Sequence, residues 1–305
     1  MKNKLLLSSL LLSGTAWLAS EYFFKYAMTP FNKKTDSKII SSKDPLYSEK
    51  IWYKNFKKQK WTLTVEPKIK LFANYIDNHS DRTAILLHGF MSDGDSMGAF
   101  SKMFYDMGYN VLIPDARAHG RSQGKYIGYG WREKEDVLKW INQIITKNSQ
   151  NQKIVIMGQS MGGATVMMVS GMKLPKQVKC FIEDCGYSTV KEEVTYQAQE
   201  TVGLPSSLCK PLVEGVSVIN KRKNKFFLEE ASSIKQLKKN TRPIFFIHGQ
   251  RDHVVPTKMV YKNYKATNTP KELWVTRLAG HAQSYPIYKK EYEEKVRAFL
   301  QKYVR

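Results

Sequence analysis

The residues from Gly158 to Gly162 form the pattern Gly-x-Ser-x-Gly, with Ser160 at its centre. An apolar run at 154–157 precedes the pattern, and small residues typical of a helix start follow it. A serine on a sharp turn from strand to helix exposes its hydroxyl, and the flanking glycines avoid clashes there. So short a pattern recurs by chance, but with this context it predicts that Ser160 is a catalytic nucleophile.

A serine hydroxyl is a weak nucleophile unless a base takes its proton. His281 follows a predicted strand at 273–278, near the end of the chain, where the order serine, acid, histidine places the base. The alternative for His281 is a solvated loop histidine. His88 and His119 also follow predicted strands, and we expect them to shape their loops and not to act as bases.

A carboxylate should orient the histidine and stabilise its charged form. Asp252 lies just after a predicted strand at 244–247, one loop before the strand that carries His281. Asp184 is the alternative acid, because it follows the preceding strand at 178–182. The sequence favours Asp252, in which case Asp184 is a structural hydrogen-bonding residue.

An oxyanion that develops on the attacked carbonyl needs two N–H donors. The first is expected to be the backbone N–H of Met161, the residue after the nucleophile. The second should come from the loop after the predicted strand at 83–87, and we expect it to be the N–H of Phe90. The expected reaction needs no metal and no organic cofactor.

From residue 61 onward, strand-like and helix-like segments alternate. The strand-like segments are 61–65, 69–76, 83–87, 110–113, 153–157, 178–182, 244–247 and 273–278. The helix-like segments are 97–107, 131–145, a helix beginning at 161, and 287–303. The first two strands should pair antiparallel. The rest of the pattern predicts an α/β fold, with a mostly parallel eight-stranded sheet and helices on both faces. Ligands bind beyond the carboxyl ends of such strands, where the motifs above lie.

Residues 188–228 interrupt the alternation with a stretch longer than an ordinary connection. Its many apolar residues predict a small, mostly helical lid, and one crossover helix with a long loop is the alternative. We expect residues 61–305 to form the catalytic domain.

The N-terminal segment 1–28 has the layout of a signal anchor or transmembrane segment. Lys2 and Lys4 precede the uncharged run 5–19. Bulky Trp17 or Leu18 would occupy the −3 position of a cleavage site, so we expect no cleavage. The alternative is a packed N-terminal helix. Residues 29–60 are expected to be a basic tether, with the protein at the cell membrane and its catalytic domain outside.

The chain has 49 lysines and arginines against 27 acidic residues, a net charge of +22. Such a surface attracts polyanions such as nucleic acid, anionic lipid and cell wall. The sequence has no zinc-finger spacing and no RNA-recognition signature, which argues against specific nucleic-acid binding. An anionic cell-wall or lipid surface is therefore the expected polyanionic partner. The spacing of the three cysteines matches no metal or redox motif.

Five motifs together resemble the α/β-hydrolase superfamily, and look most like its serine aminopeptidase S33-like branch. They are His-Gly-Phe at 88–90, Pro-Asp-x-Arg-x-His-Gly-x-Ser-x-Gly at 114–124, Gly-x-Ser-x-Gly at 158–162, His-Gly-x-x-Asp-x-x-Val-Pro at 248–256 and Gly-His at 280–281. The stretch 129–141 resembles membrane-bound cell-surface hydrolases of Gram-positive bacteria. Ala118 replaces the usual glycine of the second motif.

This resemblance, over about residues 60–303, implies the α/β-hydrolase fold and hydrolysis of esters, amides or thioesters through an acyl-enzyme. A serine hydrolase of the carboxylesterase type, acting on a small-molecule or acyl substrate, is the expected function. A peptidase or acyltransferase with the same triad is the nearest alternative. A non-catalytic polyanion-binding surface protein is an alternative of another class.

Overall fold

A computed structural model describes residues 2–30, 40–203 and 205–304, with side chains for all of these except 2–13, 15, 201, 202, 206 and 208. The strands are β1 (Gln59–Glu66), β2 (Ile69–Ile76), β3 (Arg82–Leu87), β4 (Asn110–Pro114), β5 (Lys153–Gln159), β6 (Val178–Asp184), β7 (Ile244–Gly249) and β8 (Lys271–Thr276).

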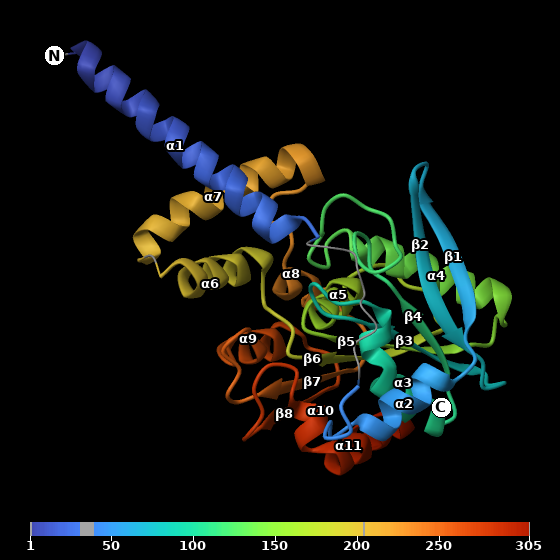
Figure 1. Ribbon diagram of the computed structural model, residues 1–305. Helices are drawn as coiled ribbons and strands as arrows, with labels where there is room; N and C mark the ends of the chain where they lie inside the picture. Colours follow the sequence, from blue (N-terminus) through green and yellow to red (C-terminus); the bar gives the residue numbers. More distant parts are fainter. Residues whose placement is uncertain (1, 31–39, 204, 305) are drawn as a thin grey trace.

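These strands form one eight-stranded sheet in the order β1-β2-β4-β3-β5-β6-β7-β8 (Figure 1). β1 pairs antiparallel with β2, and β2 antiparallel with β4, whereas all the other neighbours are parallel. The predicted sheet is therefore confirmed. The last predicted strand was too long: β8 ends at Thr276, and Leu278 beyond it is half exposed.

Helices cover both faces of this sheet, and others lie beyond its edge (Figure 1). They are α1 (Lys2–Met28), α2 (Tyr47–Asn55), the 3-10 helix η1 (Gly94–Met97), α3 (Gly98–Asp106), α4 (Glu133–Lys147), α5 (Met161–Ser170), α6 (Val190–Val202), α7 (Ser206–Asn224), α8 (Ser233–Leu237), α9 (Lys258–Ala266), α10 (Ser284–Ile287) and α11 (Lys289–Tyr303). The sequence pattern did not indicate α2, η1, α8, α9 or α10.

The apolar strands divide their side chains between two buried clusters. In β5, Ile154 and Ile156 belong to the cluster shared with α4, α5 and α9, while Val155 and Met157 belong to the cluster shared with α3 and α11. Successive side chains of a strand point to opposite faces, so a strand buried on both faces must be apolar throughout. This explains why these strands have no alternation of polar and apolar residues.

The stretch 188–228 contains two helices, α6 and α7, and not one crossover helix. Thr189 caps the start of α6, because its side chain accepts the N–H of Glu192. Gly203 ends α6 in a left-handed conformation that favours glycine. The two helices lie beyond the carboxyl ends of the strands, on the side where α1 projects from the domain (Figure 1).

Part of the segment predicted to be a tether packs against the domain. The hydroxyl of Tyr53 in α2 donates to Asp95 over 2.7 Å, and Glu49 forms an ion pair with Lys289. The Tyr53 ring lies against Gly98, where an added Cβ would come within 2.8 Å of it. Residue 1 and residues 31–39 lie outside the described part of the chain.

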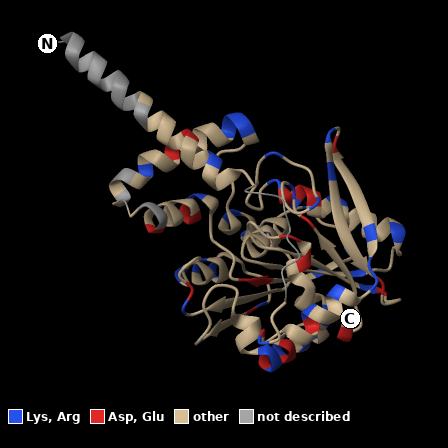
Figure 2. Ribbon diagram, viewed as in Figure 1, with Lys and Arg blue, Asp and Glu red and all other residues tan. Residues whose placement is uncertain are grey.

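The second half of α1 is partly buried, with Ser20, Phe24 and Met28 on its packed side. Leu18 and Tyr22 face outward, 69% and 75% exposed. Within the described part of the chain, no helix combines the length and the apolar character needed to cross a membrane. Lysines and arginines are spread over many helices and the β1–β2 hairpin (Figure 2).

Candidate active site

Ser160 lies between the end of β5 and the first residue of α5. Its backbone has φ 57° and ψ −117°, a conformation that costs energy and that non-glycine residues seldom adopt. The turn also needs both flanking glycines. A Cβ at Gly158 would lie 2.2 Å from the carbonyl oxygen of Gly162, and a Cβ at Gly162 would lie 2.0 Å from that of Leu87.

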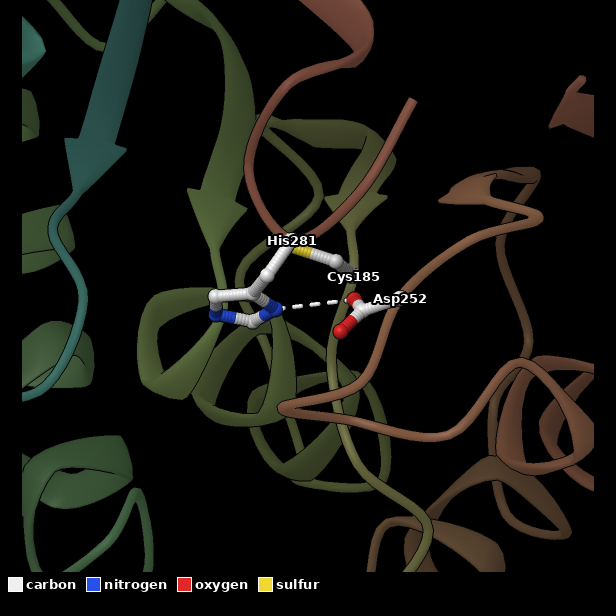
Figure 3. Close-up of side chains that lie close together, drawn as sticks. All are labelled: Cys185, Asp252 and His281. Carbon is white, nitrogen blue, oxygen red and sulfur yellow. Dashed lines mark hydrogen bonds and ion pairs between the residues drawn. The ribbon is translucent and has the colours of Figure 1, made fainter. Parts of the chain in front are cut away.

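The structure brings Ser160, His281 and Asp252 together in a hydrogen-bonded row. Nε2 of His281 lies 2.9 Å from Oγ of Ser160, and Nδ1 lies 2.8 Å from Oδ2 of Asp252 (Figure 3 shows the second bond). Since a carboxylate only accepts, the Nδ1–H must donate to Asp252. In the neutral imidazole, Nε2 then carries no proton and can accept the serine hydroxyl.

The carboxylate of Asp252 is buried and fully hydrogen-bonded. Its Oδ1 accepts the backbone N–H groups of Val254 and Val255, over 2.9 and 2.8 Å. Nε2 of His248 lies 3.3 Å from Oδ2 and 2.9 Å from the carbonyl oxygen of Val255. Burial alone would raise the pKa of Asp252, but hydrogen bonds and charge from His248 and His281 hold it well below its usual range. Asp252 therefore remains ionised at neutral pH.

The structure places Asp184 against a different partner. Its Oδ2 accepts the hydroxyl of Tyr292 in α11 over 3.0 Å, and burial raises its pKa to about 6. Its carbonyl oxygen accepts the N–H of Ser160 over 2.8 Å. Asp184 thus supports the serine turn through its backbone.

The loop expected to supply an oxyanion donor lies against the serine. A Cβ at Gly89 would come within 3.4 Å of Cβ and 3.9 Å of Oγ of Ser160, so the backbone at Gly89, the residue before Phe90, is close to the reacting hydroxyl. Nδ1 of His88 lies 2.8 Å from the carbonyl oxygen of Gly89, and Nε2 accepts the N–H of Ala116 over 2.9 Å. Burial lowers the pKa of His88 to about 4, so it stays neutral and braces this loop. The N–H of Met161 belongs to the first residue of α5, directly after Ser160.

His119 supports the same loop from the neighbouring one. Its Nε2 accepts the N–H of Met91 over 3.3 Å, and its Nδ1 lies 2.9 Å from the carbonyl oxygen of Arg117. Both ring nitrogens are thus engaged with the backbone. The arrangement is that of a loop-shaping residue.

Two further contacts at the site were not predicted from the sequence. The ring of Tyr129 stacks on that of Phe90 with centroids 5.3 Å apart, and His248 contacts the triad carboxylate. The His248 contact could have been predicted, because His248 lies at the end of β7, four residues before Asp252 in the motif at 248–256. The Tyr129 contact joins loops that are far apart in the sequence, and no local pattern indicates it.

Among the described residues, one group of three could offer metal ligands: Cys185, Asp252 and His281, with ligand atoms within 4.8 Å of one another (Figure 3). The Asp252 and His281 atoms already share a hydrogen bond. Burial, together with the negative charges of Asp184 and Asp252, raises the pKa of the Cys185 thiol well above its usual range. A protonated thiol is a poor metal ligand, and we interpret the group as part of the Ser-His-Asp row. The three cysteines, all in the described part of the chain, are buried and form no disulfide.

Comparison with known proteins identifies the family of this chain. The sequence pattern of the family Hydrolase_4, described as serine aminopeptidase S33, matches residues 78–242, more than half of the chain. The Bacillus subtilis protein YqkD, itself uncharacterised, is 28% identical over 290 residues, covering 94% of this chain and 93% of YqkD.

Solved structures share the fold. The Pyrococcus furiosus esterase Pf2001 has a TM-score of 0.70 and 25% identity, covering 90% of this chain and 98% of that one. The Pyrococcus horikoshii acylaminoacyl peptidase, at 15% identity and a TM-score of 0.59, covers 82% of this chain and 43% of that one. The architecture is the α/β-hydrolase fold.

Proposed function

Because this chain belongs to the serine aminopeptidase S33 family of hydrolases, we propose that it cleaves carboxylic esters through an acyl-enzyme on Ser160. The observation that carries the proposal is the position of His281, hydrogen-bonded to Ser160 on one side and to Asp252 on the other. This row supports activation of the serine by a correctly oriented neutral imidazole.

The reaction has two halves. Nε2 of His281 takes the proton of Ser160 as Oγ attacks the acyl carbonyl, and the N–H groups of Phe90 and Met161 stabilise the oxyanion. His281 returns the proton to the leaving alcohol, and the acyl group stays on Oγ. Water then attacks the acyl-enzyme with His281 again as base, which releases the acid and restores Ser160. Asp252 stabilises the imidazolium in both halves.

An ester is the first choice of substrate because the Pyrococcus furiosus relative, at 25% identity, is described as an esterase. The family description instead suggests peptide substrates for the same row of residues. A panel of p-nitrophenyl esters and aminoacyl-p-nitroanilides separates the two. We expect ester turnover that is lost in Ser160→Ala, and rapid anilide turnover without ester turnover would make the protein a peptidase.

We also propose that residues 1–28 attach the enzyme to the cell membrane, with the catalytic domain outside. The support is the uncharged run 5–19, the outward-facing Leu18 and Tyr22, and the net charge of +22, which favours an anionic lipid or cell-wall surface. The full-length protein should sediment with membranes and be digested by protease added to intact cells. Recovery entirely in the high-speed supernatant would contradict the attachment.

A further inference from the structure

The packed half of α1 is built into the region around α7. A Cβ at Gly215 of α7 would lie 2.2 Å from Oγ of Ser20 and 2.8 Å from its Cβ, so the two helices approach closely (Figure 1). Glu21 forms an ion pair with Lys223 over 2.6 Å, and the buried Phe24 packs edge-on against Tyr126 with ring centroids 5.4 Å apart. This half of α1 therefore has a fixed place on the catalytic domain.

The last turn of α1 holds the loop that follows Tyr126. The carbonyl oxygen of Met28 accepts the N–H of Ile127 over 2.9 Å, and that of Ala27 accepts the hydroxyl of Tyr129 over 2.8 Å. Asn224, at the end of α7, donates to the carbonyl oxygen of Ile127 over 2.9 Å. Burial raises the pKa of Tyr129, so its hydroxyl stays protonated and can donate.

Other contacts of the same loop fix the Tyr129 ring. The carboxylate of Glu133 accepts the N–H groups of Gly128 and Gly130, each over 2.8 Å, and the hydroxyl of Tyr187 donates to the carbonyl oxygen of Tyr129 over 2.9 Å. The backbone of Tyr129 has a φ of 50°, which a tyrosine seldom adopts. These hydrogen bonds hold the loop in a strained conformation, and this conformation fixes the orientation of the Tyr129 ring.

The Tyr129 ring lies against the loop of residues 88–91, which carries Phe90 and which we call the oxyanion loop. Tyr129 stacks on Phe90 at 5.3 Å with an interplanar angle of 30°, while Phe90 itself is 37% exposed. A half-exposed ring needs a packed neighbour to keep one orientation, and Tyr129 is nearly completely buried.

We propose that Tyr129 is a positioning residue for the Phe90 N–H, and that α1 sets the position of Tyr129 through the carbonyl group of Ala27. The proposal rests on the proposed function, because it assigns a role in oxyanion stabilisation. It makes the packed second half of α1, from Ser20 to Met28, a support of the active site. Movement of α1 relative to α7 changes the geometry of the oxyanion loop.

Two substitutions in the full-length protein test the first link. Tyr129→Phe keeps the ring and removes the bond to Ala27, and Tyr129→Leu removes the stacked ring as well. The oxyanion forms only during reaction, so we expect kcat for p-nitrophenyl acetate to fall about tenfold in the first and further in the second, with KM within twofold. Fluorophosphonate labelling of Ser160 should slow in parallel. Active-site titration corrects for misfolded protein. Unchanged kcat and labelling, or a change confined to KM, would overturn the proposal.

A third variant tests the link from α1. Gly215→Val pushes Ser20 away without touching the loop, and we expect it to lower kcat in the same way. Gly14→Val is the matched control, because Gly14 lies on α1 with nothing within 4 Å of an added Cβ, and it should keep wild-type kcat. Wild-type kcat in Gly215→Val would overturn the role of α1. A wild-type protein that neither hydrolyses esters nor labels would reject the proposed function itself, whereas an active wild type with unaffected variants rejects this inference alone.

Discussion

Oδ2 of Asp252 lies 2.8 Å from Nδ1 of His281, and the other oxygen of the same carboxylate is held by two backbone N–H groups. The carboxylate therefore cannot rotate away without losing three hydrogen bonds. A rigid, ionised acceptor fixes both the tautomer and the direction of the imidazole. The loop after β7, which carries Asp252, thereby controls the proton transfer from Ser160 to His281 at the end of β5.

Asp252→Asn should lower kcat about a thousandfold or more, because an amide in this place can donate to Nδ1 and favours the wrong tautomer. Ester turnover corrected by active-site titration measures the loss. Asp184→Asn is the matched control. It retains an acceptor for Tyr292, and kcat should stay within about tenfold of wild type. The reverse ranking would transfer the acid role to Asp184.

Gly162→Ala should prevent the serine turn from forming, because the new Cβ would lie 2.0 Å from the backbone oxygen of Leu87. Backbone cannot yield as a flexible side chain does, so we expect a loss of more than about 3 kcal/mol or no folded protein. Thermal unfolding of the purified variant measures the effect. Gly14→Ala, in open space within α1, should not lower the melting temperature, because alanine is a better helix former than glycine. A folded Gly162→Ala variant with the wild-type melting temperature would contradict the described turn.

Arg117 and Asp136 form a bidentate ion pair, with N–O distances of 2.8 and 2.7 Å, and both side chains are only 6% exposed. Removing one partner leaves a buried charge unpaired, so Arg117→Met should cost about 3–5 kcal/mol. The double variant Arg117→Met with Asp136→Leu should recover part of that loss, since neither partner of the ion pair then leaves an unpaired buried charge, although the buried Glu133 remains nearby.

The exposed ion pair of Lys102 and Asp106 provides the comparison for the Arg117 and Asp136 variants. Lys102→Met should change the free energy of unfolding by less than about 1 kcal/mol. Chemical denaturation at neutral pH measures all four proteins. If the double variant is as unstable as Arg117→Met, the loss is one of packing and not of an unpaired charge.

Glu193 of α6 is buried, and its Oε2 has no hydrogen-bond partner within the described residues. Burial, together with the negative charge of Asp252, raises its pKa to about 8 from an ordinary 4.5. The folded protein thus binds this proton more tightly than the unfolded chain does. Its contribution to stability is complete below about pH 4.5 and is lost as the pH rises through about 8.

Glu193→Gln mimics the protonated side chain at every pH. The variant should melt close to the wild type at pH 5 and above it at pH 8, and melting curves across this range measure the difference. The half-buried Gln197 donates its amide to Oε1 of Glu193 over 3.0 Å. Gln197→Glu replaces this donor with a second carboxylate, and it is a charge control that should lack the pH-dependent gain. Equal melting temperatures of Glu193→Gln and wild type at pH 8 would mean that Glu193 does not hold its proton.

Local patterns predicted the parts of the site that depend on neighbours in the chain. The serine turn could be predicted because Gly158 and Gly162 meet backbone only a few residues away or on the adjacent strand. Asp252 and His281 could be predicted from their order after successive strands, since parallel strands end at the same edge of the sheet.

The packing of the N-terminal region could not be predicted in this way. The bond between Tyr53 and Asp95 and the contact between Ser20 and Gly215 join residues far apart in the sequence, through single polar or small side chains. Such contacts leave no periodic pattern in the sequence. The residues of α2 were therefore predicted to be part of a tether, and those of α1 to be a signal anchor. The stacking of Tyr129 on Phe90 was not predicted for the same reason.

The central claim is that Ser160 is a nucleophile activated by His281. Its most direct test is reaction of the intact protein with a fluorophosphonate, followed by mass spectrometry of the digested peptides. We predict one phosphonylated residue, Ser160, with no labelling in Ser160→Ala and labelling slowed at least about a hundredfold in His281→Ala. A folded wild-type protein that stays unlabelled, or is labelled at another serine, would contradict the account.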